Sequence, residues 1–328
     1  METPGGRNAL ATDIVAPAKR RVGRRAWLGG IGLGAAGVGA GLIYNAAPFF
    51  WKQFAKDLGN TIAPAPRHPD PAKWPDQGIH AAWLGHSTVL MKIDGFTIIT
   101  DPVFSSWIGL GLGPFTLGMK RLVEPALELE KLPRVDLILL SHAHMDHFDL
   151  PSLRALEANK PEVVTAHATS DLLRVRNYRR VQEAGWGQQV RVGPATIQAF
   201  EVRHWGARLR SDTYRGYNAY IIRTGRYRVV FGGDTAITDT FRQVGGADLA
   251  IMPVGAYNPW IRVHCNPEQA WQMANDARAD LVLPVHHRTF HLSQESSSEP
   301  LERILGAAGN ACDSRIPARV IGDELHHA

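Results

Sequence analysis

The sequence is poor in several features that would point to particular protein classes. It has two cysteines in 328 residues, Cys265 and Cys312. They could pair in an oxidising compartment, but two cysteines do not make a disulfide framework, and we expect Cys265 to be a free buried thiol. Outside the N-terminus there is no low-complexity tract, long linker or visible internal repeat. With 45% hydrophobic residues, the chain can bury a large core in one or two domains.

Most of the chain also lacks an excess of positive charge. The formal net charge is +5, but residues 1–56 alone carry +6, which leaves −1 for residues 57–328. The basic character therefore comes from the N-terminal segment. We expect no nucleic-acid partner.

That N-terminal segment is predicted to be separate from the fold. The basic stretch 19–25 precedes residues 26–47, which are nearly free of charge and rich in glycine and alanine. This pattern is typical of an export signal or a membrane anchor, and residues 24–28 (Arg-Arg-Ala-Trp-Leu) resemble a twin-arginine signal. The alternative is a disordered basic tail followed by a glycine-rich linker.

Two regions follow from this reading. Residues 1–56 would be the signal or anchor with its linker, and residues 57–328 the catalytic domain. The basic residues 19–25 would stay on the cytoplasmic side of the membrane. The catalytic domain would then lie on the periplasmic side, anchored through residues 26–47.

Four potential metal ligands lie within six residues, directly after the apolar run 137–140. His142 and His144 follow a predicted buried strand and should point to the same side, because extended side chains repeat every two residues. Asp146 and His147 lie in the loop beyond, free to turn toward a second ion. Imidazole and carboxylate groups suit zinc and similar divalent cations. The alternative is a group of polar residues in a surface loop.

Three further candidate ligands each follow a strand-like segment. These residues are His204, Asp234 and His286. When several strands are each followed directly by one such residue, we expect an α/β sandwich with a site at one edge of its sheets. A lone histidine after a strand is more often structural, but a set of seven residues weighs against that reading.

The order His-x-His-x-Asp-His, His, Gly-Asp-Thr and a late His resembles the metallo-β-lactamase superfamily. Five other segments are more similar to the branch of N-acylphosphatidylethanolamine-hydrolysing phospholipase D and the ascorbate-phosphate lactonases, namely 83–89, 100–106, 251–257, 264–270 and 286–290. The resemblance covers about residues 79–321 and implies a four-layer αβ/βα sandwich.

The resemblance also implies a centre of two divalent ions, which we expect to be zinc. The first ion would have the ligands His142, His144 and His204, and the second would have Asp146, His147 and His286. Asp234 would bridge the two ions. Two ions about 3.5–4 Å apart share a water and lower its pKa, so a metal-bound hydroxide would attack a phosphorus or carbonyl centre.

Several other residues are candidates for supporting roles. Asp146 would also help to move a proton, and His264 could contact the scissile group. Asp101 is expected to hold the second ring nitrogen of a ligand histidine, and the alternative is a turn residue before a proline. For His86, a structural hydrogen bond and a catalytic role both remain open, whereas His287 is expected to be structural.

Turn and helix signals give a coarse secondary structure. The Asp94-Gly95 pair predicts a hairpin with arms at 87–93 and 96–100. Prolines near the starts of three segments predict helices over 150–159, 267–277 and 300–306.

The apolar, glycine-rich segment 107–115 gives the best indication of substrate. It predicts a lid or groove for an acyl chain, or an element that dips into a membrane, and nearby Lys120 and Arg121 could meet a phosphate. The alternative is a buried loop. We therefore expect a binuclear metal-dependent hydrolase, a phosphodiesterase acting on a phospholipid-like substrate. The alternatives are a lactonase or thioesterase for small soluble substrates, and a membrane-tethered, metal-stabilised binding protein.

Overall fold

The computed structural model describes residues 47–113, 115–209 and 211–328. A compact unit spans Trp51–Ala328, and the predicted boundary after residue 56 falls inside helix α2 (Ala47–Gly59). The predicted signal or anchor at 26–47 lies outside the described residues except for its last position. Within the described ranges, no helix is long and apolar enough to cross a membrane.

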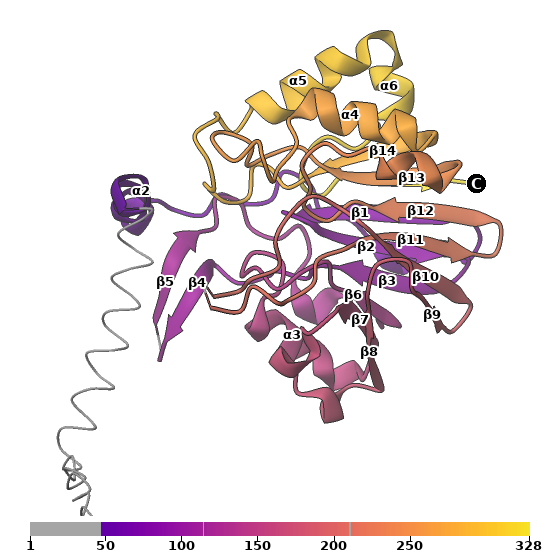
Figure 1. The fold of residues 1–328 in the computed structure, drawn as a ribbon, viewed down its shortest axis with the longest axis horizontal. Coiled ribbons are helices and arrows are strands. Elements are labelled where there is room, and N and C mark those ends of the chain that lie inside the picture. Colours follow the sequence, from indigo (N-terminus) through magenta and orange to yellow (C-terminus); the bar gives the residue numbers. More distant parts are fainter. Residues whose placement is uncertain (1–46, 114, 210) are drawn as a thin grey trace, which may run out of the picture. The chain divides into compact units, whose positions relative to one another are not determined.

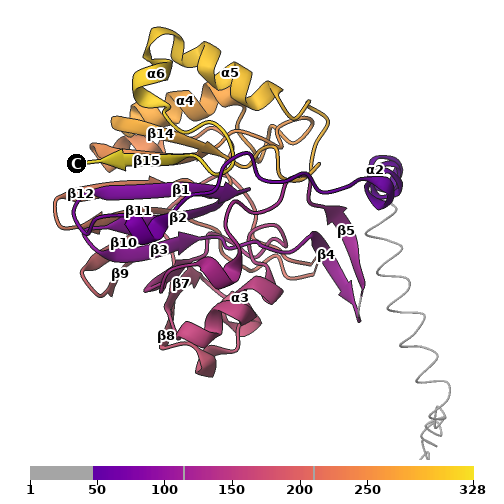
Figure 2. The same ribbon diagram turned by 180° about the vertical axis from the view of Figure 1, so that it is seen from behind.

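Two mixed β-sheets form the centre of this unit (Figures 1 and 2). In spatial order, the seven-stranded first sheet contains β15 (Glu324–His327), β1 (Ile79–Gly85), β2 (Thr88–Ile93), β3 (Phe96–Thr100), β6 (Leu137–Leu139), β7 (Glu162–Ala166) and β8 (Arg180–Ala184). The six-stranded second sheet contains β14 (Ala279–Val285), β13 (Ala247–Pro253), β12 (Tyr227–Phe231), β11 (Ala219–Thr224), β10 (Ala195–Phe200) and β9 (Gln189–Val192).

Side chains of the second sheet alternate between two hydrophobic cores. Val229 and Phe231 of β12 belong to the core shared with the first sheet, whereas Val230 between them belongs to the core under the C-terminal helices. This alternation follows from the two-residue period of a strand. Both faces of the second sheet are therefore covered.

Helices cover the outer sides of the sheets. Helices α4 (Pro267–Asp276) and α5 (Glu299–Ala308) contribute to the core on the outer face of the second sheet. In Figure 1, these helices and α6 (Cys312–Arg315) lie beside β13 and β14, whereas α3 (Leu150–Leu156) lies beside β6, β7 and β8. The arrangement confirms the predicted α/β sandwich.

The predicted turn and helix signals are confirmed. The Asp94-Gly95 turn has φ angles of 46° and 80°, as a two-residue hairpin turn requires, and it joins β2 to β3. Helix α4 begins at Pro267 behind a capping box of Asn266 and Gln269. Helix α3 ends three residues earlier than expected and continues as a short 3₁₀ helix. Both cysteines are free, and Cys265 is buried as expected.

The apolar segment 107–115 is not a buried loop, which was the alternative to a lid or groove. It forms a separate two-stranded antiparallel sheet of β4 (Trp107–Leu112) and β5 (Phe115–Lys120). Its base is held by α2, because the Asp57 carboxylate accepts a hydrogen bond from the Lys120 backbone N–H at 3.1 Å. Figures 1 and 2 show this hairpin standing apart from the two large sheets.

Strand direction explains why the candidate ligands can meet. Strands β1 and β3 are both antiparallel to β2, and β3 is parallel to β6, so all three end at the same edge of the first sheet. In the second sheet, β10, β12 and β14 likewise share one direction. The loops that follow these strands carry the predicted site residues.

Candidate metal centre

The structure brings all seven predicted ligands into one buried cluster. The histidines meant for the first ion form what we call the first ligand group, which contains His142, His144 and His204. The Nδ1 atom of His144 lies 2.9 Å from the Nε2 atom of His142 and 3.3 Å from that of His204. His142 and His144 therefore point to the same side, as the two-residue spacing predicts.

The second ligand group contains Asp146, His147 and His286. The Nε2 atoms of His147 and His286 each lie 3.6 Å from Oδ2 of Asp146. These separations are those of ligand atoms that share an ion, and they are too long for direct hydrogen bonds.

Asp234 lies between the two groups. Its Oδ2 atom is 3.1 Å from His286 Nε2 and 3.2 Å from His147 Nε2 in the second ligand group. It is also 3.9 Å from His142 Nε2 and 3.8 Å from His204 Nε2 in the first. A carboxylate in this place can bridge two ions, as predicted.

Orphaned polar atoms show that this cluster suits a cation. The Nε2 atoms of His147 and His286 and the Oδ1 atom of Asp234 are buried without a hydrogen-bond partner among the described residues. Buried polar atoms without partners are costly, and a bound ion would satisfy them. Nitrogen and oxygen ligands in two adjoining sets therefore fit two divalent cations.

The electrostatics of the protein groups alone differ between the two ligand groups. Burial alone would lower the pKa values of His286 and His147, but the two carboxylates among the candidate ligands raise the pKa of His286 to about 9 and that of His147 well above its usual range. Burial alone would raise the pKa of Asp234, but positive charge on His147 and His286 holds it well below its usual range. In the first ligand group, burial and then the neighbouring His204 lower the pKa of His144 to about 3. Neutral imidazole and ionised carboxylate are the forms that bind metals, so His147 and His286 would each release a proton when an ion binds the second ligand group.

Asp101 holds two ligand histidines, one directly and one through Ser141. The His147 ring donates from Nδ1 to Asp101 Oδ2 at 2.6 Å, which leaves Nε2 for an ion. The Ser141 hydroxyl donates to the same carboxylate at 2.5 Å, so it can accept from His142 Nδ1 at 2.8 Å. The predicted role of Asp101 therefore agrees with the contacts, whereas Ser141 carried no signal in the sequence beyond its place before His142.

The backbone orients His204 in a similar way. Its Nδ1 atom donates to the carbonyl oxygen of Val263 at 2.8 Å, so Nε2 faces Asp234. The next residue, His264, has its Nδ1 atom 3.7 Å from Asp234 Oδ2, and its ring lies 5.0 Å from His204 and 5.5 Å from His286. His264 therefore adjoins both ligand groups.

Trp205 is a neighbour of the centre that the sequence analysis did not single out. Its ring centroid lies 4.7 Å from that of His144 and 4.6 Å from that of His204, and the residue is 42% exposed. Two other exposed apolar residues, Trp260 and Ile261, lie in the turn that leads to His264. An exposed tryptophan directly after a predicted ligand is the signal that could have found this feature.

The two cations expected to meet a phosphate have other partners. Arg121 is buried and donates from Nε to the Ser105 carbonyl oxygen at 3.1 Å, while its guanidinium stacks over Phe290. The Lys120 ammonium donates to the Asn60 carbonyl oxygen at 2.5 Å and lies over the Trp107 ring. Both side chains hold the base of the β4–β5 hairpin, while Arg121 Nη1 has no hydrogen-bond partner among the described residues, so contact with a phosphate stays a prediction.

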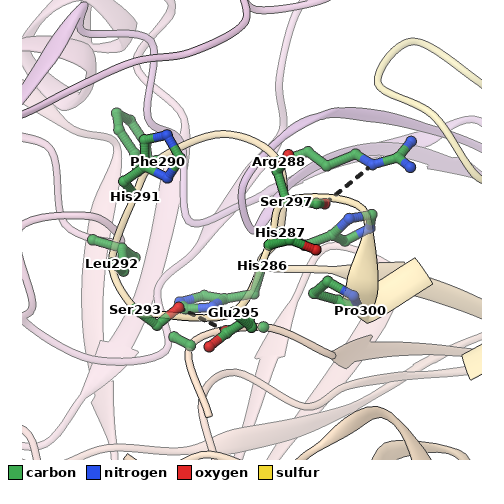
Figure 3. A pocket seen from close by; sticks show the side chains of 13 residues that line it. His286, His287, Arg288, Phe290, His291, Leu292, Ser293, Glu295, Ser297 and Pro300 are labelled. Carbon is green, nitrogen blue, oxygen red and sulfur yellow. Dashed lines mark hydrogen bonds between the residues drawn. The ribbon is translucent and has the colours of Figure 1, made fainter. Parts of the chain in front are cut away.

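A small cavity adjoins the segment that follows His286 (Figure 3). Its volume is about 30 Å³, enough for about one water and too small for a substrate. Figure 3 shows Ser293 and Glu295 on the loop around it, and the Glu295 carboxylate also accepts from the Tyr257 backbone N–H at 3.2 Å. His287 stacks on Trp83 at 4.6 Å, in keeping with its expected structural role.

Comparison with known proteins gives the family context of this centre. The sequence matches the beta-lactamase superfamily domain over residues 97–287. An uncharacterised protein of Mycobacterium tuberculosis is 34% identical over 241 residues, which cover 69% of this chain and 63% of that protein. The matched region thus spans less than two thirds of the mycobacterial relative.

One relative and one solved structure carry functional names. N-acyl-phosphatidylethanolamine-hydrolyzing phospholipase D 1 of Caenorhabditis elegans is 29% identical over 250 residues, 70% of this chain and 69% of that protein. The structure of Igni18, a metallo hydrolase of Ignicoccus hospitalis, superposes with a TM-score of 0.59 at 18% identity, covering 77% of this chain and 99% of that one. At this identity the structural likeness shows the fold.

Proposed function

The chain belongs to the metallo-β-lactamase superfamily, and on this premise we propose that it is a phosphodiesterase whose substrate carries an apolar tail, such as a phospholipid. Its family and its clustered histidines and aspartates make it a metal-dependent hydrolase. We propose zinc as the metal, because imidazole nitrogens and carboxylates suit that ion. Two bound divalent ions would supply an activated water and stabilise negative charge on the attacked group.

The chain's own residues can assist this reaction in two ways. The Asp146 side chain is 15% exposed, compared with 1% for Asp234, so it is the carboxylate of the centre that is placed to exchange a proton with solvent. His264 lies beside both ligand groups and can contact an oxygen of the scissile group. Asp101 and Ser141 keep the ligand rings oriented while the substrate binds.

The observation that carries the substrate class is the contact of exposed Trp205 with the ligand histidines. A tryptophan ring next to the reacting groups offers apolar surface to a substrate. The β4–β5 hairpin adds Leu112 and Phe115, which are 55% and 75% exposed. Exposed apolar groups of this kind mark sites for lipids, membranes or other apolar partners.

A groove near the hairpin offers space for an apolar tail. Its volume is about 730 Å³, and its lining combines apolar side chains such as Phe104 and Leu127 with charged ones, namely Arg121, Glu124, Glu128, Glu130 and Lys131. Arg121 stacks over Phe290 at 5.0 Å, and Phe290 lies 5.3 Å from His86 at the metal centre. Arg121 and Phe290 thus connect the groove to His86 at the metal centre. The volume of the groove lies within the usual range for ligand pockets.

The similarity to a named phospholipase D favours a phosphodiester over a carboxylic ester or lactone. The expected N-terminal anchor at 26–47 also supports a lipid substrate, because it would hold the exported domain at a membrane surface. A lactonase or thioesterase for small soluble substrates remains the alternative reaction for the same centre.

Substitutions in the hairpin test the substrate class. Replacing Leu112 and Phe115 together by serine should lower kcat/KM for a long-chain phosphodiester at least tenfold, because each buried methylene contributes about 0.8 kcal/mol. The rate on bis(p-nitrophenyl) phosphate, a small soluble phosphodiester, should change little. Val175→Ser is a matched control, since Val175 is exposed on a different element.

Two results would count against this substrate class. Equal losses on both substrates would mean that the hairpin supports only the fold. A strong preference of the unaltered chain for small lactones or thioesters would identify the alternative reaction.

A further inference from the structure

We infer that, within the metal centre on which the proposed function rests, His86 is a positioning residue that holds Asp146 and His286 in place for the second ion. His86 lies in the turn between β1 and β2, remote in sequence from both ligands. Its side chain contacts Asp146, and its backbone carbonyl contacts His286. Loss of His86 should therefore weaken binding of the second ion and leave binding of the first unchanged.

The side-chain contact fixes Asp146. The His86 Nε2 atom lies 3.0 Å from Asp146 Oδ2, a normal hydrogen-bond length for a ring N–H donor. Asp146 itself lies in a turn between β6 and α3, and its nearest other ring nitrogens belong to its fellow ligands at 3.6 Å. His86 is thus the neighbour outside the second ligand group that can hold this carboxylate.

The backbone contact fixes His286. The His286 backbone N–H donates to the carbonyl oxygen of His86 at 3.0 Å, and the Trp83 indole N–H donates to the same oxygen at 2.8 Å. The backbone N–H of His86 donates to the Thr289 hydroxyl at 2.6 Å. These bonds join the first sheet to the segment after β14, which carries His286.

The conformation of His86 is specialised for this task. Its φ is 50°, in the left-handed region that few residues other than glycine occupy, and the residue is 1% exposed. Such a backbone persists only where its surroundings fix it, and here three hydrogen bonds do so. The ring therefore has little freedom to turn away from Asp146.

Direct ligation is the competing role for His86. One ligand atom from each of His86, Asp146, His147 and His286 lies within 4.8 Å of the others. We favour the donor role because Asp234 already stands 3.1–3.2 Å from His147 and His286, which leaves the second ion with four ligands without His86. A proton on Nε2 would then serve Asp146 and block ligation by that atom.

Metal binding by the full-length chain tests the inference. His86→Phe keeps a buried ring without a donor, and His86→Gln restores an amide N–H. We expect His86→Phe to bind the second zinc ion about 10–100-fold more weakly than the unaltered chain, the range typical for partners of metal ligands, with the first ion unchanged. His86→Gln should recover part of this affinity. Chelator competition measures both affinities, and mass spectrometry of metals measures occupancy.

His287→Phe is the matched control, because His287 is buried next to a ligand and stacks on Trp83 without a contact to Asp146 among the described residues. It should bind both ions normally. The inference is overturned if His86→Phe keeps the second ion at normal affinity, or if His287→Phe loses it equally. Thermal unfolding of the metal-free proteins separates a packing defect from a metal-binding defect.

Cobalt substitution separates the donor role from ligation. With Co²⁺ in place of zinc, loss of a ligand changes the visible absorption spectrum of the ion. We expect His86→Gln to keep the spectrum of the unaltered chain, and an altered spectrum at full occupancy would show that His86 is a ligand. If the unaltered chain itself binds no metal, the proposed function fails and not only the role of His86.

Discussion

At the scale of single residues, Asp234 connects the two halves of the metal centre. Its Oδ2 atom lies within 3.9 Å of a nitrogen from five different histidines, four of them candidate ligands and the fifth His264. Asp234→Ala should lower the occupancy of both ions and reduce hydrolysis by several orders of magnitude. Asp239→Ala, which removes an exposed carboxylate in the same loop, should change neither. A variant at position 234 that keeps two ions and near-normal turnover would contradict the bridging role.

Asp101 permits a second test at this scale. In the unaltered chain, Asp101 accepts from the Ser141 backbone N–H at Oδ1 and from His147 and the Ser141 hydroxyl at Oδ2. Asp101→Asn keeps the size of the side chain but replaces one of these oxygens by an NH₂ group, so at least one of the donors loses its acceptor. Zinc affinity should fall about 10–100-fold. Chelator competition checks this, and an unchanged affinity would show that the two ligand rings are held by packing alone.

The seven candidate ligands were predictable because their residue types, order and position after apolar runs carry the signal. Ser141 and Trp205 were not, since one hydroxyl or one indole near a ligand has many possible roles. Their contacts depend on which loops come together in space. Ser141 donates to Asp101 in the loop after β3 at 2.5 Å, and the Trp205 ring in the loop after β10 lies 4.7 Å from that of His144. Local sequence does not specify which loops come together.

At the scale of elements, α3 supports the loop that carries four of the candidate ligands. Its N-cap residue, Asp149, accepts hydrogen bonds from the Ser152 backbone N–H at 3.3 Å and from the Ser105 hydroxyl at 2.7 Å. Asp149→Ala should lower the free energy of unfolding by about 1–2 kcal/mol, as the loss of an N-cap does. Urea unfolding measures this.

Asp149→Asn is the control for that substitution, because asparagine is also a good N-cap. It should retain most of the stability. If both variants unfold at the same urea concentration as the unaltered chain, Asp149 does not cap α3 in solution.

The β4–β5 hairpin is an element that the sequence did not predict. Its glycines favour a loop, yet Gly109 and Gly118 lie directly opposite each other in the paired strands. A Cβ atom on Gly118 would lie 1.8 Å from the carbonyl oxygen of Ile108, so the glycines permit a close approach of the two strands. By contrast, the β2–β3 hairpin was predictable because Asp94-Gly95 is a local turn signal.

At the scale of the whole molecule, the candidate site lies entirely within one compact unit of the chain. The compact unit begins at Trp51, and every residue assigned to the metal centre lies after position 80. A chain that lacks residues 1–50 should therefore remain folded and bind two ions. Circular dichroism and metal analysis check this, and an unfolded or metal-free product would contradict it.

The export route is a second prediction at this scale. Replacing Arg24 and Arg25 by lysine should leave the precursor on the cytoplasmic side, because a twin-arginine signal requires that pair. Protease treatment of intact cells and spheroplasts measures the location. Normal export of the lysine variant would remove the twin-arginine reading while leaving the proposed enzyme activity untouched.

The fold could be predicted as a whole because the ligand pattern identifies one superfamily, and its sandwich follows from that identification. The substrate could not, because it depends on the surface around Trp205, Leu112 and Phe115. These side chains come from one loop and one hairpin that no sequence pattern links. Their exposure is a property of the folded molecule.

The central claim is a binuclear centre, and the metal content of the purified full-length chain tests it most directly. Mass spectrometry of metals after dialysis, combined with quantitative amino-acid analysis, gives the number of ions per chain. The seven candidate ligands predict two divalent ions per chain and loss of hydrolysis when a chelator removes them. A chain that hydrolyses its substrate at full rate with one ion or none would contradict the account.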